Sequence, residues 1–412
     1  MKTMYKVRNE LGTPLGPNAV KLLLLGGGEL GKEMALEAQR LGIEVVVVDR
    51  YDWAPAMHVA HRKYVVDLLN YSAVKAVIER EKPDAIIPEI EAINVDVLEE
   101  LEAKGYHVIP NAKAVKIAMN RLKLRKFAVE LGLPTTRYRF ADEWREVYKA
   151  CEEIGPPCLV KPEMSSSGHG HYKMVSADAS EARKAYEYAI GHSRGISKRV
   201  IVEEYVELET EFTVIAYRWV DVDKGRIVTN VMEPIEHWRY GKYHYIESWQ
   251  PSTRPRDLLA KAENMAFRVA EALGGLGVFG VEFLYTKDGR LLFSEVAPRP
   301  HDTGLVTLVS QDISEFEAHV RAALGLPIPE IKVLTPAASI AIYTDLDGKW
   351  YPILEGAYEA ARIPGVKLLF FGKPFTYRGR RMAVIIARGE TVEEARRRAR
   401  EAAKRVKVVS RD

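Results

Sequence analysis

Two glutamates, Glu282 and Glu295, lie on either side of a short turn and could together bind a metal ion. The segment that contains them reads VFGVEFLYTKDGRLLFSEV, and its Asp288-Gly289 dipeptide favours a two-residue type I′ hairpin turn. In such a hairpin Lys287 faces Arg290, and the same register sets Glu282 directly opposite Glu295, with Cβ atoms ~5 Å apart. Facing like charges destabilise a sheet unless a cation such as Mg²⁺ is held between the carboxylates and nucleotide phosphates. We therefore predict a Mg²⁺ site here, the alternative being two solvated glutamates on an exposed hairpin face.

A second candidate is a loop of small residues that follows a predicted strand ending at Lys161. From Glu163 to His171 the loop reads EMSSSGHGH, and small residues let backbone N–H groups approach phosphate oxygens closely. Lys161 can add the positive charge that a phosphate needs. The Walker A pattern is absent from the sequence, so this would be a different phosphate loop; the alternative is a flexible surface loop.

A third candidate is the acidic end of a predicted strand, where Val202–Glu207 reads VEEYVE. Backbone groups of such a strand and linker could hold an adenine, and a carboxylate could hold a ribose. The order of the three features along the chain, a lysine with a small-residue loop, an acidic strand end and paired glutamates, indicates a nucleotide site.

Alternating strands and helices must position these groups. Strands are predicted at residues 21–25, 44–48, 85–88 and 106–109, and helices after the first strand to about residue 41 and at 72–81 and 94–104. Strands that alternate with helices predict a doubly wound parallel sheet. We expect this first domain to span residues 1–120.

The rest of the chain predicts an α+β domain at 121–325 and a small β-rich domain at 326–412. Elements expected in the former are helices at 121–131 and 255–273, strands at 158–161, 200–202 and 213–217, and the hairpin. The last domain is expected to contain strands at 337–343, 366–371 and 382–386 and a basic helix at 391–404. Glutamates are interspersed among the arginines of that helix, so we expect a solvated face.

Composition narrows the class of protein. With 412 residues, 47% hydrophobic and 28% charged, the chain should fold into several globular domains. A formal net charge of only +3 gives no global field for nucleic acid or membrane, so we expect neither as a partner. Cys151 and Cys158 are too few to stabilise a chain of this length by disulfides, which favours a reducing compartment. No signal peptide or apolar span is recognisable, so we expect a cytoplasmic protein.

The order of these motifs resembles the ATP-grasp superfamily and, within it, the formate-dependent phosphoribosylglycinamide formyltransferases of purine biosynthesis. The resemblance covers the chain from about Lys21 onward. It is carried by GGGELGKE, VDRYDWAPAMHVAH, PEIEAI, MNRLKLR, LVKPEMSSSG, GVFGVEFL, FSEVAPRPHDTG, SQDISEF and FGKP followed by RGRR.

The resemblance implies a set of ATP contacts and, as in other family members, a homodimer. It implies that Glu282 and Glu295 hold Mg²⁺, in agreement with the hairpin argument. The residues implied to meet ATP are Arg121, Lys161, Ser166, Ser167, Gly168, His169, Gly170 and His171 at the phosphates, Glu203, Glu204, Tyr205 and Val206 at the adenine, and Glu211 at the ribose.

The resemblance also implies a site for glycinamide ribonucleotide, which carries a phosphate at one end and an amine at the other. The implied contacts are Glu29, Leu30, Glu89 and Asp302, with Lys373, Arg380 and Arg381 at the phosphate. Glu29 and Glu89 follow predicted strands, at the carboxyl edge where ligands of doubly wound sheets bind. Lysine and arginine suit a dianionic phosphate.

The implied reaction has two steps. Formate attacks the γ-phosphate of ATP, with cations neutralising the developing charge, and the amine then attacks the resulting formyl phosphate. Positioning and exclusion of water should dominate such catalysis, with Lys161, Glu282, Glu295 and Asp302 as the residues expected to act in it. This agrees with the lack of a Ser-His-Asp or Cys-His nucleophile signature.

One residue departs from the family pattern. His169 stands where these enzymes commonly carry a lysine in the phosphate loop. A neutral imidazole would remove one positive charge, so we expect activity to fall as His169 deprotonates. An unchanged pH–rate profile in His169→Lys would contradict this.

Other functions would fit parts of the sequence. Gly26-x-Gly28-x-x-Gly31 with Asp49 fits a dinucleotide fingerprint and would indicate an NAD-dependent oxidoreductase, but no hydride-transfer site accompanies it. A carboxyaminoimidazole ribonucleotide synthetase, which activates bicarbonate, shares the ATP-grasp features. A noncatalytic binding protein is disfavoured because Lys161 and both glutamates are present.

His58 and His61 have helical spacing but no third ligand for zinc, so we expect a structural or surface role.

Overall fold

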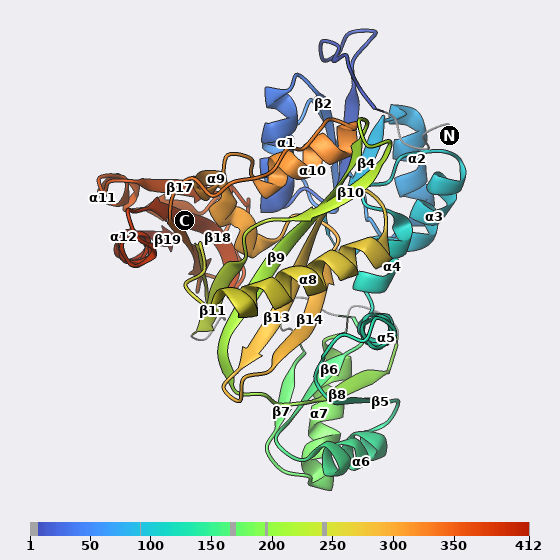
Figure 1. The fold of residues 1–412 in the computed structure, drawn as a ribbon, viewed down its shortest axis with the longest axis vertical. Helices are drawn as coiled ribbons and strands as arrows, with labels where there is room; N and C mark the ends of the chain where they lie inside the picture. Colours follow the sequence, from blue (N-terminus) through green and yellow to red (C-terminus); the bar gives the residue numbers. More distant parts are fainter. Residues whose placement is uncertain (1–6, 91, 165–169, 194–196, 241–244, 412) are drawn as a thin grey trace. The chain divides into compact units, whose positions relative to one another are not determined.

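The computed structural model describes residues 7–90, 92–164, 170–193, 197–240 and 245–411. They form two compact units (Figure 1). The first unit comprises Met1–Ala114, Glu211–Val281 and Ala297–Asp412, and the second comprises Val115–Thr210 and Glu282–Val296. The chain passes from one unit to the other within α4 (Ala112–Ala118), β9 (Leu208–Asp221), β13 (Gly277–Thr286) and β14 (Leu291–Ala297).

A four-stranded sheet in the order β3-β2-β1-β4 opens the first unit, and all its strands are parallel. Its elements are β1 (Lys21–Leu25), α1 (Glu29–Arg40), β2 (Glu44–Asp49), η1 (Pro55–His58), β3 (Arg62–Val65), α2 (Tyr71–Glu81), β4 (Ala85–Pro88) and α3 (Val95–Ala103). Leu22–Leu25 and Val45–Val48 are fully buried along their whole length, as expected of a parallel sheet covered on both faces. The predicted doubly wound parallel sheet is confirmed. The predicted strand at 106–109 is wrong, since only Val108 forms an isolated parallel bridge, to Ile86.

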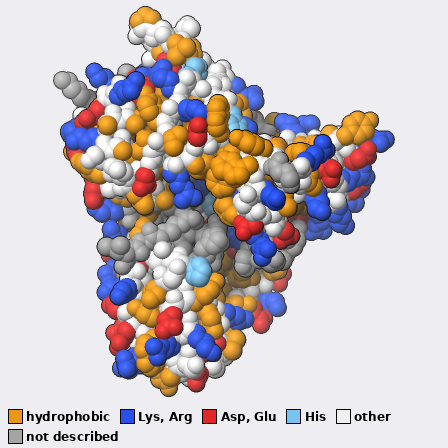
Figure 2. Space-filling view, turned by 180° about the vertical axis from the view of Figure 1, so that it is seen from behind, with side chains coloured by type: hydrophobic (Ala, Val, Ile, Leu, Met, Phe, Trp, Pro, Cys, Tyr) orange, Lys and Arg blue, Asp and Glu red, His pale blue; other side chains and the backbone are white. Residues whose placement is uncertain are grey.

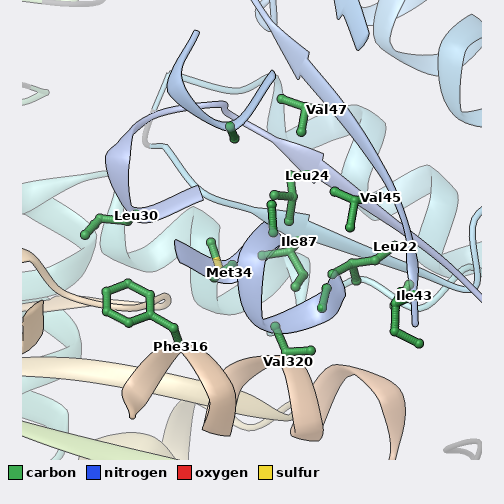
Figure 3. Packing of buried hydrophobic residues seen from close by; sticks show 14 of the residues in the cluster. Leu22, Leu24, Leu30, Met34, Ile43, Val45, Val47, Ile87, Phe316 and Val320 are labelled. Atoms are coloured by element: carbon green, nitrogen blue, oxygen red, sulfur yellow. The ribbon is translucent and has the colours of Figure 1, made fainter. Parts of the chain in front are cut away.

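The core of this sheet is closed by two helices that lie far apart in the sequence (Figure 3). Met34 of α1 lies between the strand residues Leu24 and Ile87 and the side chains of Phe316 and Val320. The last two belong to α10 (Glu315–Leu324), which starts at the cap residue Ser314 and ends at Gly325 in a left-handed conformation. The α10 helix therefore covers the sheet beside α1.

A large antiparallel sheet fills the rest of the first unit. The order of the whole sheet is β14-β13-β9-β11-β12-β15-β18-β17, with β10 on β9, and β16 and β19 pair separately. The elements not yet named are β10 (Arg226–Val231), β11 (Ile235–Tyr240), β12 (Tyr245–Gln250), α8 (Arg256–Leu273), η2 (Asp302–Val306), α9 (Thr307–Ser310), β15 (Ala337–Thr344), β16 (Ile353–Glu355), α11 (Ala357–Ala361), β17 (Val366–Phe370), β18 (Arg380–Arg388), α12 (Val392–Arg405) and β19 (Lys407–Val409).

The basic helix α12 is less solvated than its sequence indicates. Arg396 and Arg400 both pair with Glu247 of β12, each with a closest N–O distance of 2.8 Å, and Glu247 is buried. The guanidinium of Arg396 also lies 3.8 Å from the ring centroid of Trp249. The prediction of a solvated arginine face is therefore wrong at Arg396 and Arg400, because these two neutralise a carboxylate that the sheet buries.

The second unit is built around the antiparallel sheet β5-β8-β6-β7. Helices α6 and α7 pack on it through a core that includes Val147, Ala182 and Val202. Cys151 and Cys158 are buried in the same core as free thiols. The elements are α4 (Ala112–Ala118), α5 (Arg121–Glu130), β5 (Tyr138–Ala141), α6 (Trp144–Ile154), β6 (Cys158–Pro162), β7 (Tyr172–Met174), α7 (Ala179–Gly191), β8 (Val200–Glu204) and β14 (Leu291–Ala297).

The turn between β13 and β14 differs from the predicted two-residue turn. The amide of Thr286 donates to the carbonyl of Arg290 (3.0 Å), so the loop has three residues. Gly289 adopts a left-handed conformation (φ 82°), whereas Asp288 does not have positive φ, which is the pattern of a type I turn followed by a G1 bulge. The hydroxyl of Thr286 accepts from the Arg290 amide (2.9 Å) and contacts the Asp288 carboxylate. These local bonds stabilise the longer loop.

Charges of both signs are mixed on the face of the molecule shown in Figure 2, where Lys and Arg side chains lie among Asp and Glu side chains. This agrees with a net charge of +3 in the whole sequence. Within the described residues, every helix is too short or too polar to cross a bilayer.

Candidate functional site

In the second unit, Lys161 ends in a buried ion-pair cluster. Its Nζ contacts Oε2 of Glu203, whose Oε1 accepts from Nε of Arg125 at 2.7 Å. Glu203 is 1% exposed; burial would raise its pKa, but the charges of Arg125 and Lys161 hold it well below the usual range. Burial lowers the pKa of Lys161, helped by Arg125 and opposed by Glu203. The strand pairing of β6 with β8 brings these groups together.

Arg121 joins this cluster from the first turn of α5. Asn120 caps the helix by accepting from the amides of Leu122 and Lys123, and its Nδ2 donates to Glu163 (2.6 Å), just after β6. The guanidinium of Arg121 donates to the carbonyl of Pro162 (2.9 Å). Arg121 therefore lies against the strand end that carries Lys161.

The small-residue loop itself is only partly described. Ser166, Ser167, Gly168 and His169 lie outside the described residues, so the expectations for them stay predictions. His171 lies 3.4 Å (Nε2) from the Arg121 guanidinium, and Gly170 has φ 76° and packs against Pro162. The described end of the loop thus lies beside the cationic cluster.

The acidic strand end is arranged differently from what the sequence indicates. The Glu203 and Glu204 side chains both serve as charge partners: Glu204 accepts from the amide of Arg137 (3.0 Å) and pairs with Arg290 (3.1 Å). Tyr205 is exposed and its ring lies 3.5 Å from Nζ of Lys173. Val206 follows it at the end of this segment, and backbone contacts to adenine stay a prediction. Glu211 lies in the first unit, on β9, 3.5 Å from Arg239.

The two hairpin glutamates are not equivalent. Glu282 is buried and Glu295 is exposed. The turn pairs Thr286 with Arg290, so the facing of Glu282 and Glu295 does not follow from the turn and stays a prediction. Both carboxylates still lie on adjacent strands, and the charge of Glu295 acts on Arg121. Two carboxylates fit Mg²⁺, which prefers oxygen ligands and shares them with phosphates.

In the first unit, the glycine-rich turn after β1 is packed by Glu89. Oε1 of Glu89 accepts from the Gly31 amide at 3.1 Å, and a Cβ on Gly26 or Gly28 would lie 2.5 Å or 2.9 Å from a Glu89 carboxylate oxygen. Asp49 accepts from the Gly27 amide at 2.7 Å. The glycines therefore leave room for Glu89, and Asp49 holds the turn itself, which explains the fingerprint without a dinucleotide.

The protonation of Glu89 predicts a pH-dependent stability. Burial raises its pKa to about 8, opposed by Arg299 and reinforced by Glu29 and Asp49. A raised pKa contributes stability below the unfolded value near 4.5, and this contribution is lost as pH rises to about 8. We expect Glu89→Gln to gain stability relative to wild type across this window, by a few kcal/mol. Urea unfolding of both proteins at pH 5 and pH 9 measures this difference in stability. Burial also raises the pKa of Glu315 to about 8, but Glu315 is present in both proteins, so its contribution cancels in the difference. An equal difference at both pH values would contradict the expectation.

Four predicted substrate residues form one chain of ion pairs. Glu29, the first residue of α1, accepts from Nζ of Lys373 (2.8 Å) and from Arg381 (2.8 Å), and Arg381 also pairs with Asp302 (2.6 Å). Burial would raise the pKa of Glu29, but Lys373 and Arg381 lower it to about 2. Against the same effect of burial, Arg381 holds the pKa of Asp302 well below its usual range. Both carboxylates are therefore ionised near neutral pH.

The remaining predicted contacts lie around this chain. Leu30 is buried in the core beside Glu29. Arg380 precedes Arg381 on β18 and is 5% exposed, with Nη1 donating to the carbonyl of Phe375 (2.5 Å) and Nη2 to the hydroxyl of Tyr51 (3.1 Å). The first unit thus brings together all three predicted phosphate cations.

Two residues of these clusters were not predicted from the sequence. Arg125 lies four positions after Arg121 on α5, and that spacing places both on one helix face, a signal that could have found it. Tyr51 follows β2, at the same carboxyl edge as Glu29 and Glu89, so the rule that selected them also applies to it. His58 and His61 contact the backbone, at the Trp53 carbonyl (3.1 Å) and the Val45 amide (3.0 Å), in keeping with the expected structural role.

Comparison with known families assigns three segments. Residues 20–119 match the ribonucleotide synthetase preATP-grasp domain, residues 126–316 the ATP-grasp domain, and residues 337–406 the domain described as PurT, C-terminal.

Similar proteins extend this comparison to full length. The formate-dependent phosphoribosylglycinamide formyltransferase of Sulfurisphaera tokodaii is 58% identical, covering 97% of this chain and 100% of that protein. The glycinamide-RNase-transformylase T of Mycobacterium tuberculosis superposes with a TM-score of 0.77 at 31% identity, over 94% of this chain and 100% of that one. The N5-carboxyaminoimidazole ribonucleotide synthetase of Thermotoga maritima gives 0.79 at 28% identity, over 95% and 99%.

Proposed function

Because the chain belongs to the family of formate-dependent phosphoribosylglycinamide formyltransferases, we propose that it formylates N1-(5-phospho-D-ribosyl)glycinamide with formate and ATP. The products are N-formylglycinamide ribonucleotide, ADP and phosphate, as in purine (IMP) biosynthesis. The observation that carries the proposal is the 58% identity over 97% of the chain. The enzyme is an ATP-grasp ligase of this family, with ATP as cosubstrate.

Activation of formate would use the cationic cluster of the second unit. A formate oxygen attacks the γ-phosphorus of ATP, the bond to the ADP oxygen breaks, and formyl phosphate and ADP result. Lys161 and Arg121 supply positive charge where negative charge develops on the phosphoryl group. Glu203 and Arg125 keep Lys161 in place. Glu282 and Glu295 would hold Mg²⁺, which when bound neutralises phosphate charge.

Transfer of the formyl group would use the ion-pair chain of the first unit. The amine nitrogen attacks the formyl carbon, the carbon–oxygen bond to phosphate breaks, and the amine loses a proton. Ionised Asp302 suits the amine end of the substrate, since a carboxylate can hydrogen-bond the amine and stabilise its developing positive charge. Lys373, Arg380 and Arg381 suit the phosphate end.

The domain roles follow from this assignment. We assign residues 1–120 to substrate binding, 121–325 to nucleotide and Mg²⁺ binding, and 326–412 to completing the phosphate site. By family resemblance the enzyme is a cytoplasmic homodimer.

The experiment is an assay of ADP release with Mg-ATP and glycinamide ribonucleotide, with and without formate, and mass detection of the product. Formate-dependent ADP release and a product heavier by one formyl group are expected. The likeness to carboxyaminoimidazole ribonucleotide synthetases supplies the second candidate. A parallel reaction with aminoimidazole ribonucleotide and bicarbonate tests it, and turnover only there would overturn the formyltransferase assignment.

A further inference from the structure

The three cations at the expected phosphate site differ in their partners. Lys373 and Arg381 are each paired with a carboxylate at 2.8 Å or less. Arg380 has no carboxylate partner within the described part of the chain, and its Nε, although buried, has no hydrogen-bond acceptor there. It therefore carries the positive charge that the protein itself leaves least compensated.

Aromatic rings enclose this guanidinium. Its carbon lies 4.2 Å from the ring centroid of Phe375, 5.1 Å from that of Tyr377 and 5.4 Å from that of Tyr51. Ring faces attract a cation, but less than a charge-assisted hydrogen bond does. A buried cation held mainly by rings suits an anionic ligand, which would supply the missing countercharge.

Tyr51 holds Arg380 through an acceptor contact and keeps its own proton available. The hydroxyl accepts from Nη2 of Arg380 at 3.1 Å, and a phenol oxygen that accepts one bond can still donate another. Burial raises the pKa of Tyr51, with Arg380 opposing, so the phenol stays protonated near neutral pH. Nε and Nη2 are bonded to the same guanidinium carbon, so an anion that accepts from Nε would lie close to the Tyr51 hydroxyl.

We propose that Tyr51 is a specificity-determining positioning residue for the phosphate of the ribonucleotide substrate, acting by orienting Arg380 toward a phosphate oxygen. The inference rests on the proposed function for the identity of the substrate. Tyr51 lies in the loop after β2, and β2 is the neighbour of β1, whose loop carries Glu29. It therefore belongs to the edge where such sheets bind ligands.

The test compares wild type with Tyr51→Phe, which keeps the ring and removes the hydroxyl. The KM for glycinamide ribonucleotide should rise about tenfold, with kcat and the KM for ATP within twofold of wild type. The KM for the dephosphorylated glycinamide riboside, assayed in parallel, should change little. The preference for the phosphorylated substrate should therefore fall by the same factor as the KM rises. Tyr64→Phe is the matched control, since it removes a hydroxyl that donates to Glu81 at 2.5 Å in the same parallel sheet.

Direct binding separates this inference from the proposed function. Ribose 5-phosphate binding, measured by calorimetry, should weaken about tenfold in Tyr51→Phe and stay unchanged in Tyr64→Phe. Wild type that binds ribose 5-phosphate but shows no formate-dependent turnover would overturn the proposed function alone. The role of Tyr51 would be overturned if Tyr51→Phe bound ribose 5-phosphate as well as wild type does. It would also be overturned if the KM rose equally for the ribonucleotide and the riboside.

Discussion

Glu203→Leu is expected to destabilise the second unit by about 3–5 kcal/mol, because it leaves two buried cations without their carboxylate. Lys161 and Arg125 both contact Glu203, and the side chains of Arg125 and Glu203 are only 8% and 1% exposed. Since the pKa of Glu203 is lowered by folding, the carboxylate contributes stability above the unfolded pKa, and this contribution is lost only in acid. Urea unfolding at pH 7, together with hydrogen exchange of the β6 and β8 amides, measures the loss.

Two further variants decide whether charge is the cause. Glu207→Gln removes a glutamate that pairs with Lys287 at 3.3 Å, with both side chains exposed, and should cost no more than about 0.5 kcal/mol. Combining Glu203→Leu with Lys161→Met and Arg125→Met removes the two cations that lack a carboxylate partner, and it should recover most of the stability. A Glu203→Leu protein as stable as wild type, or a triple variant no better than the single one, would show that the cluster does not stabilise the fold.

The regular elements were predictable because hydrophobic periodicity and caps mark them. The apolar runs at Leu22–Leu25 and Val45–Val48 could belong only to buried strands, and the helix starting at Arg121 begins where Asn120 supplies a cap. β9 was harder: only its middle was predicted, yet it runs from Leu208 to Asp221. Its ends carry charged residues that resemble strand breakers. Arg218, for example, is buried and pairs with the exposed Glu271, which lies 53 positions away.

The hairpin shows the limit of a turn rule. Asp-Gly favours a type I′ turn on average, but bonds of the Thr286 hydroxyl with Asp288 and Arg290 select a three-residue loop. The longer loop changes the register beside the turn, so the pairing of Glu282 with Glu295 does not follow from the dipeptide alone. The pairing was therefore sensitive to a contact that the dipeptide alone does not reveal.

The candidate sites were predictable as residue types but not as partnerships. Family resemblance and the carboxyl-edge rule selected Glu29, Glu89 and the three phosphate cations. That Glu203 neutralises Lys161 and Arg125 depends on contacts between segments 42 and 78 residues apart, and no local pattern encodes such a contact. Likewise, Arg380 and Arg381 are adjacent and alike in sequence, yet β18 gives them different surroundings.

Arg381→Met is expected to lower kcat/KM for glycinamide ribonucleotide by at least about 100-fold, while the KM for ATP stays within twofold of wild type. Arg381 bridges Glu29 and Asp302, so its loss removes one cation and leaves two half-buried carboxylates partly uncompensated. The exposed Arg378, three positions earlier on the same segment, provides the control: Arg378→Met should leave kcat/KM unchanged within twofold. Steady-state kinetics with each substrate varied in turn distinguishes these outcomes.

The pH dependence identifies which part of this loss is electrostatic. In wild type the pKa of Glu29 is about 2, so acidification to pH 5 should not titrate it. Without Arg381 the effect of burial is opposed mainly by Lys373 at Glu29, and by His301 and Arg239 at Asp302. The pKa of both carboxyl groups should rise, so the activity of the variant relative to wild type should fall further as pH decreases. Arg381→Lys keeps the charge but lacks the planar fork that contacts both carboxylates, so it should restore the pH profile more than kcat/KM. If Arg381→Met and wild type keep a constant activity ratio from pH 8 to pH 5, Arg381 acts through geometry alone.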